Sequence, residues 1–343
     1  MKRRPLGLRR RAIHAATGAI TLPASRRIVL PTERPPRGRR GSQLASLALA
    51  AMALLVAPPS EAQQGLGNKI LGTLGLRAGS QPDSGIYLAD RFLFYSADQV
   101  IDRNGRRIPV NVDLDAVANA FGIAGTFELP WLSTYFNAAV GVPVAHVTLE
   151  TDRPEASVDK YGLGDIYVQP LKLGWKLNRL DLVAGYAFYA PTGRYEVGGQ
   201  GGVGGGQWTQ QFSLGSSVYF DRARTWQLSA LASYELNQRK QDIDITRGAT
   251  FQIQGGIGKT LFGIFDVGLT GYALWQVTDD RGSDLPPPLR GARDQAFGLG
   301  PEIGIALVPL RSRLSVRYEH DIFVKARPFG QILVIGLTFQ AIP

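Results

Sequence analysis

Hydrophobic and polar residues alternate with a period of two along most of the chain after residue 84. In 226–237 the even positions are Trp, Leu, Ala, Ala, Tyr and Leu, whereas the odd positions are mostly polar. The segment 265–278 repeats this pattern, and 333–339 places Leu, Ile, Leu and Phe on one face. A strand that separates lipid from a wet lumen needs one apolar and one polar face. The pattern therefore predicts membrane-spanning β-strands.

Marking every such run predicts about twelve strands, an even number as in single-chain bacterial barrels. We place them at 85–95, 109–128, 134–150, 162–177, 180–192, 208–220, 226–237, 249–261, 264–278, 295–308, 312–326 and 330–340. Around Asp90, and from Asp165 to Gln169, polar residues share a face with apolar ones. We interpret these two places as bulges or strand ends.

The connections between these strands alternate in length, as barrel turns and loops do. With the first strand running outward, the outer connections are 96–108, 151–161, 193–207, 238–248, 279–294 and the short 327–329. The inner ones are 129–133, 178–179, 221–225, 262–263 and 309–311. A soluble all-β fold, the alternative, gives no reason for this sorting. The prediction is an all-β transmembrane antiparallel up-and-down barrel over residues 85–340.

The segment before the barrel has the layout of a secretory leader. An apolar stretch at 44–57 follows the basic run 37–40 and precedes the small residues Ser60 and Ala62. A membrane anchor, the alternative, would need about 20 apolar residues. We therefore predict a basic leader and signal peptide over 1–62, cleaved after Ala62. The glycine-containing segment 63–84 is then a periplasmic tail or a short plug.

The charge of the chain is concentrated in that leader. The formal net charge is +10, and residues 1–62, with 12 basic and two acidic side chains, carry all of it. The neutral remainder argues against nucleic acid as a partner. With no cysteine in the chain, disulfides, thiol nucleophiles and cysteine zinc sites are excluded.

Charged and polar side chains in the predicted strands are the candidate functional residues. A charge that faces lipid at the bilayer midplane costs about 2–4 kcal/mol, so these side chains are expected to point into the lumen. They are Asp113, Asp115, Lys172, Lys176, Glu235, Asp266, Glu302, Arg317 and Glu319. There they could orient the polar group of a solute. Equally, they could fill the lumen with salt bridges and have no substrate role.

Other candidate chemistry is weak. The glycine-rich stretch 198–206 lacks the Lys-Ser/Thr of a phosphate-binding loop, so it is expected to be an outer loop. A barrel hydrolase would need a serine and a histidine brought together, and His146 and His320 lie in no diagnostic motif. No spacing of His, Asp and Glu recurs that would predict a metal site, and no cofactor is implied.

Several short motifs resemble one known family. They are Tyr161–Ile166 followed by Pro170, Ala190–Tyr195, Gly206–Trp208, Tyr234–Asn237 and the acidic strand Val112–Asp115. In these the chain resembles the outer-membrane proteins of the meta-pathway of phenol degradation family, over most of residues 85–340. The resemblance implies a barrel in the outer membrane of a Gram-negative bacterium, associated with passage of hydrophobic or aromatic compounds.

Three functions remain open from the sequence. The preferred hypothesis is passive uptake of small hydrophobic compounds, aromatic ones included, with the lipid bilayer of the outer membrane and the solute as partners. The alternatives are a structural or adhesive barrel with a plugged lumen and, less favoured, an outer-membrane hydrolase. Neither the solute nor the oligomeric state follows from the sequence.

Overall fold

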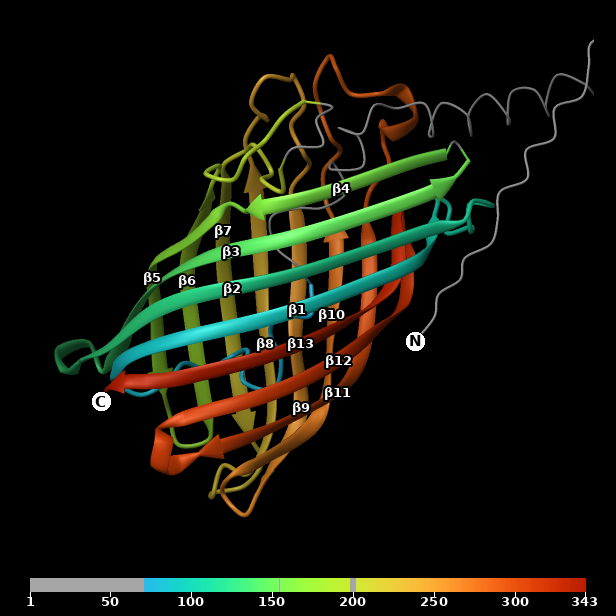
Figure 1. The fold of residues 1–343 in the computed structure, drawn as a ribbon. Helices are drawn as coiled ribbons and strands as arrows, with labels where there is room; N and C mark the ends of the chain where they lie inside the picture. Colours follow the sequence, from blue (N-terminus) through green and yellow to red (C-terminus); the bar gives the residue numbers. More distant parts are fainter. Residues whose placement is uncertain (1–70, 154, 198–201) are drawn as a thin grey trace, which may run out of the picture. The chain divides into compact units, whose positions relative to one another are not determined.

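The computed structural model describes residues 71–153, 155–197 and 202–343 (Figure 1). The predicted leader and signal peptide over 1–62, the cleavage site after Ala62 and residues 63–70 of the following segment lie outside the described residues. None of the helices in the described part of the chain is long and apolar enough to cross a membrane.

The described residues form thirteen strands. They are β1 (Gly85–Ile101), β2 (Val112–Leu129), β3 (Thr134–Asp152), β4 (Glu155–Leu163), β5 (Ile166–Lys176), β6 (Leu180–Ala190), β7 (Thr209–Tyr219), β8 (Trp226–Asn237), β9 (Thr250–Leu261), β10 (Phe265–Gln276), β11 (Gln295–Leu307), β12 (Ser312–Lys325) and β13 (Arg327–Ile342). Three single-turn 3₁₀ helices, η1 (Pro130–Leu132), η2 (Pro287–Leu289) and η3 (Val308–Leu310), lie in connections.

Twelve of these strands close into an antiparallel barrel. Neighbours in sequence pair with each other, and β1 closes the sheet by pairing with β13, from Ile86 with Ile342 to Ile101 with Arg327. β2 pairs with β3 along its whole length. The predicted all-β up-and-down barrel is confirmed, because every edge except that of β4 is paired within the described residues.

β4 is the departure from the predicted twelve strands. The segment 151–161 was expected to be an outer loop, but most of it forms β4, which folds back on the outer half of β3 from Asp152–Glu155 to Val144–Leu163. The inner half of β3 pairs instead with β5. Figure 1 shows β4 beside β3 at the edge of the sheet, tilted in the same direction as β1 to β3.

Only one of the two predicted irregularities is present. Asp165 lies between β4 and β5, and the register of β5 shifts after Val168 against β6 and after Gln169 against β3. The interpretation of 165–169 as a strand end and bulge is therefore confirmed. At Asp90 it is wrong, because the register of β1 runs without interruption from Tyr87 to Ala97 against β13.

The two faces of the strands have the compositions that the alternation predicts. On β8 the outward Leu228 and Leu236 are exposed, whereas the inward Ser229, Ser233 and Glu235 are buried. Outward apolar residues on other strands include Phe121, Leu214, Leu269, Ile303 and Leu337. An apolar exterior around a polar lumen is the arrangement of an outer-membrane barrel.

Two inner turns have the same backbone conformation. In β2–η1–β3 and in β11–η3–β12, a 3₁₀ turn containing proline ends on a residue with left-handed backbone, Ser133 in the first and Arg311 in the second. Another inner turn, at Phe262 and Gly263, has two consecutive positive φ angles, as a tight hairpin turn requires. These short turns mark the inner end of the barrel, and the long loops mark the outer end.

Candidate functional site

The chain before β1 runs through the lumen. Leu71 is buried against inward residues of β1, β10 and β13, and Leu76 is fully buried. We call residues 71–84 the N-terminal segment. Its backbone is held by lumen side chains: the Leu74 N–H donates to Gln254, the Leu76 N–H to Glu302 at 2.9 Å, and the Gly79 N–H to Ser229 at 2.7 Å.

Glycines allow the N-terminal segment to lie this close to the wall. A Cβ on Gly75 would come within 1.8 Å of Glu302 Oε2 and 2.3 Å of Arg317 Nη2, and one on Gly79 within 1.9 Å of the Ser216 carbonyl oxygen. Any side chain at these positions would displace the segment.

Three of the predicted site residues hold the N-terminal segment from β10, β11 and β12, and a fourth, Glu319, lies beside it. Arg317 donates through Nε to Glu302 at 3.0 Å and through Nη1 to the Gly72 carbonyl at 2.6 Å. Glu319 is fully buried beside Gly72. Asp266 accepts from Thr260 at 2.5 Å and pairs with Arg77 at 3.2 Å and with Arg313.

The polar wall of the lumen is centred on Glu235 of β8. Its carboxylate accepts hydrogen bonds from Gln211 at 2.7 Å, Gln252 at 2.9 Å and Thr250 at 3.2 Å. These four side chains are buried and come from three adjacent strands, β7, β8 and β9. Glu235 is therefore fully hydrogen-bonded within the wall.

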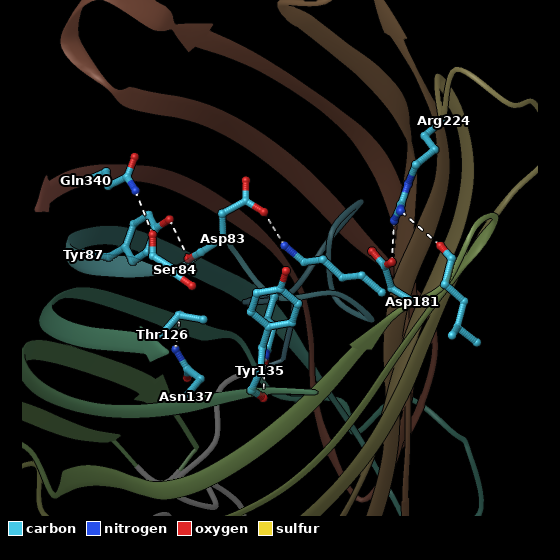
Figure 2. Close-up of polar contacts among 12 residues, drawn as sticks. Asp83, Ser84, Tyr87, Thr126, Tyr135, Asn137, Asp181, Arg224 and Gln340 are labelled. Atoms are coloured by element: carbon cyan, nitrogen blue, oxygen red, sulfur yellow. Dashed lines mark hydrogen bonds and ion pairs between the residues drawn. The ribbon is translucent and has the colours of Figure 1, made fainter. Parts of the chain in front are cut away.

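The two predicted lysines of β5 also reach the N-terminal segment. Lys172 Nζ donates to the Ser80 carbonyl at 3.4 Å, and Lys176 Nζ pairs with Asp83 at 2.5 Å while lying over the Tyr135 ring. Figure 2 shows Asp83 beside Tyr135, with Tyr87 donating to the Asp83 carbonyl. Seven of the nine predicted residues thus line one lumen; six of them contact one another or the segment within it, and Glu235 contacts its neighbours in the wall.

Asp113 and Asp115 do not join this set. They alternate with the buried Val112 and Leu114, and Asp113 is exposed opposite Glu150 of β3. The predicted inward orientation is wrong for both. The reason for Asp113 is its position at the outer end of β2, where an outward carboxylate meets water and carries no midplane cost. Asp115 lies one turn of the alternation further in, and one of its carboxylate oxygens is buried.

An apolar wall lies across the lumen from Glu235. Leu93, Ala118, Leu274, Val324, Ile332 and Val334 form one buried cluster with Tyr272 and Leu71. Its strands are β1, β2, β10, β11, β12 and β13, and β1 and β13 lie across the ring of strands from β8. The lumen therefore has an apolar surface across from the hydrogen-bonded wall around Glu235, and the charged residues Asp266, Glu302, Arg317 and Glu319 share strands β10 to β12 with this surface.

The sequence did not single out a second group of inward residues. Arg91 of β1 points inward on the same face as Leu93, and Tyr167 of β5 and Tyr189 of β6 pair their rings at 5.1 Å. The Tyr167 hydroxyl donates to Gln169, which donates to Asn137 at 2.7 Å. The bulge in β5 shifts the alternation of polar and apolar positions at this point. A period-two pattern in the sequence therefore does not show that Tyr167 and Gln169 belong to a polar face.

The outer loops pack together over the strand ends. Asp165 accepts hydrogen bonds from the backbone N–H groups of Gly193 and Gly205, both at 3.0 Å, and burial raises its pKa. Arg247 and Asp294 form a buried ion pair at 3.0 Å. Lys240 Nζ lies 5.3 Å from the centre of the Tyr195 ring, and burial lowers the pKa of Lys240 to about 8.

The two histidines of the barrel make separate contacts. His146, on the outward face of β3, pairs with Asp159 of β4 at 2.7 Å. His320, on β12, contacts the backbone oxygen of Asp321 through Nδ1. In the parts of the chain that the structure covers, neither forms a contact with a serine hydroxyl of the kind a hydrolase uses.

Comparison with solved structures gives the same fold. The COG4313 outer membrane channel from Pseudomonas putida F1 superposes with a TM-score of 0.66 at 13% identity, covering 76% of this chain and 97% of that one. The CymD monoaromatic hydrocarbon channel gives a TM-score of only 0.39 at 11% identity, covering 84% of this chain and 98% of that one. No curated protein matches the chain in sequence.

A family model matches most of the barrel. The model described as "Putative MetA-pathway of phenol degradation" matches residues 97–335, from the outer part of β1 to the middle of β13. The match covers more than half of the chain and nearly all of the barrel. The chain therefore belongs to the phenol-degradation MetA-pathway family and is an outer-membrane β-barrel.

Proposed function

We propose that this barrel carries small hydrophobic molecules, aromatic compounds included, passively across the outer membrane. The observation that carries the proposal is the two-sided lumen, with the apolar cluster around Leu93 and Val334 facing the hydrogen-bonded wall around Glu235. An apolar surface with a few fixed polar groups is the usual lining of a site for small organic molecules.

Membership of the phenol-degradation family supports aromatic compounds as solutes. The fold shared with the COG4313 channel supports passage through the barrel. The seven inward charged residues, from Lys172 to Glu319, are proposed to line the solute path, with the N-terminal segment narrowing it. Neither a cofactor nor a catalytic step is part of this proposal.

Uptake by cells tests the proposal. Cells that make the barrel are expected to take up radiolabelled benzyl alcohol faster than cells making the Ala120→Trp variant. Ala120 of β2 is paired with Arg91 of β1, so the new indole would fill the lumen beside Arg91. The matched control is Ala232→Trp, which places the same side chain on the outward face of β8. Equal uptake in all three strains would contradict passage through the lumen.

A structural barrel with a plugged lumen is the second candidate. The contacts of the N-terminal segment with β8, β9, β10 and β11 favour it. Purified barrel that gives no flux of any neutral solute in reconstituted outer-membrane vesicles would select this alternative over the channel.

A further inference from the structure

One inward side chain lies in open space within the lumen. Arg91 shares the inward face of β1 with the buried Leu93, yet its side chain is exposed, unlike that of Leu93. Lipid does not reach the inner face of a closed barrel, so the Arg91 side chain is exposed to the space inside the lumen. The described residues therefore do not fill the lumen at this level.

A second cation and two aromatic rings face the same space. Lys172, three strands away along the sheet, lies within electrostatic range of Arg91. Tyr167 and Tyr189 also interact electrostatically with Arg91, and their paired rings form one aromatic surface. Because Lys172 Nζ contacts the Ser80 carbonyl, this group lies directly beside the N-terminal segment.

The nearby carboxylates are already occupied. Glu302 and Glu235 are the acidic side chains in range of these groups. Glu302 binds Arg317 and the Leu76 N–H, and Glu235 accepts from Gln211, Gln252 and Thr250. Among the described residues, no carboxylate lies within ion-pair distance of the Arg91 guanidinium or the Lys172 ammonium group.

Two cations without a counter-ion in a narrow lumen favour an anion between them. A guanidinium binds a carboxylate through two parallel N–H bonds, and an aromatic ring contacts other rings edge-on or offset. We propose that Arg91 and Lys172 bind the carboxylate of a small aromatic acid whose ring lies against Tyr167 and Tyr189. This inference rests on the proposed function and narrows its substrate class to aromatic carboxylates.

Equilibrium binding to the purified, folded full-length barrel tests the site, with benzoate, benzyl alcohol and inorganic phosphate as probes. Benzoate is expected to bind at least tenfold more tightly than either of the others. Arg91→Met and Lys172→Met should each remove most of that preference, and Arg91→Lys should keep part of it. The control is Arg293→Met, which removes an arginine whose partner is Asp279 in an outer loop.

The outcomes separate the steps of the argument. Circular dichroism and the heat-dependent gel shift identify any variant that fails to fold. If Arg91→Met does not fold, the preference of Arg91→Lys for benzoate is measured in its place. An unchanged preference for benzoate in folded Arg91→Met barrel would overturn the site. Phosphate that binds as tightly as benzoate would overturn the aromatic part of the proposal.

The failure of this inference is distinguishable from failure of the proposed function. If benzyl alcohol enters cells through the barrel but benzoate shows no preferential binding, only the carboxylate site is lost. If benzoate binds in the predicted manner but no solute crosses the membrane, the transport proposal is lost and the site stands as a binding site.

Discussion

At the scale of single residues, Lys240 in the outer loops is a buried charge without a close counter-charge. Lys240 is 5% exposed, and its ammonium group faces the Tyr195 ring rather than a close carboxylate. Burial and the neighbouring charge of Arg247 lower its pKa, whereas Asp165 and Asp280 act in the opposite direction. A buried lysine of this kind destabilises its surroundings when it is protonated.

The stability of the packed outer loops should therefore depend on pH. The pKa of Lys240 is about 8 in the folded loops against an ordinary value of 10.5, so the unfolded loops bind more protons between these values. Loop stability should rise across this window, by at most about 3 kcal/mol. Hydrogen exchange of the loop 238–249, corrected for intrinsic rates, measures it from pH 7 to 10.5.

Lys240→Met should remove this rise and protect the loop at pH 7. The control is Arg239→Met, the preceding basic residue in the same loop. A pH dependence that is the same in wild type and Lys240→Met would show that another group is responsible.

At the scale of elements, hydrogen bonds of its backbone hold the N-terminal segment against the barrel wall. The segment has little regular structure of its own, and its shape is imposed by donors and acceptors on β8, β11 and β12. Segments held in this way open more readily than paired strands, because each contact is separate from the sheet. Of these contacts, the one at Gly75 lies nearest to the buried ion pair of Glu302 and Arg317.

Gly75→Leu should release the N-terminal segment while the barrel stays closed. The new side chain would overlap Glu302 and Arg317, and that pair cannot move without leaving buried charges unpaired. Trypsin should then cleave after Arg77 at least tenfold faster than in wild type. The control is Ser80→Leu, because the Ser80 hydroxyl makes only an exposed 3.4 Å bond. Slow cleavage in folded Gly75→Leu barrel would contradict this fit.

At the scale of the whole molecule, the ring of strands brings an apolar and a polar wall face to face. The N-terminal segment lies between them, contacting Tyr135 of β3 through Gln81 and Asp266 of β10 through Arg77. It therefore spans the lumen from one part of the ring to another. Its removal should widen the path more than any single substitution in the wall.

Replacing residues 71–81 by a glycine-serine stretch of equal length should raise the single-channel conductance in planar bilayers severalfold. The flexible replacement loses the buried Leu71 and Leu76 and the bonds to Glu302 and Ser229 that hold the segment in place. Scrambling residues 82–84 at the inner end serves as the control. An unchanged conductance would mean that the N-terminal segment does not limit the path.

The sequence by itself determined the strands and their faces, because alternation along a strand is a local property. The strand 226–237 was predicted at both ends, and the other strands of the twelve differ mainly at their outer ends. The exception is β4, whose polar residues on both faces predict a loop. Beyond the bilayer both faces of a strand are wet, so β4 carries no alternation to detect.

Only the tertiary structure decided which charged residues meet. Glu302 and Arg317, and Gln211 and Glu235, are brought together by strand register, whereas Arg91 and the tyrosines of β5 and β6 converge because the sheet curves into a ring. The path of residues 71–84 through the lumen is likewise set by contacts up to 256 residues away along the chain. Pairings between positions so far apart leave no periodic trace in the sequence, since no local spacing encodes them.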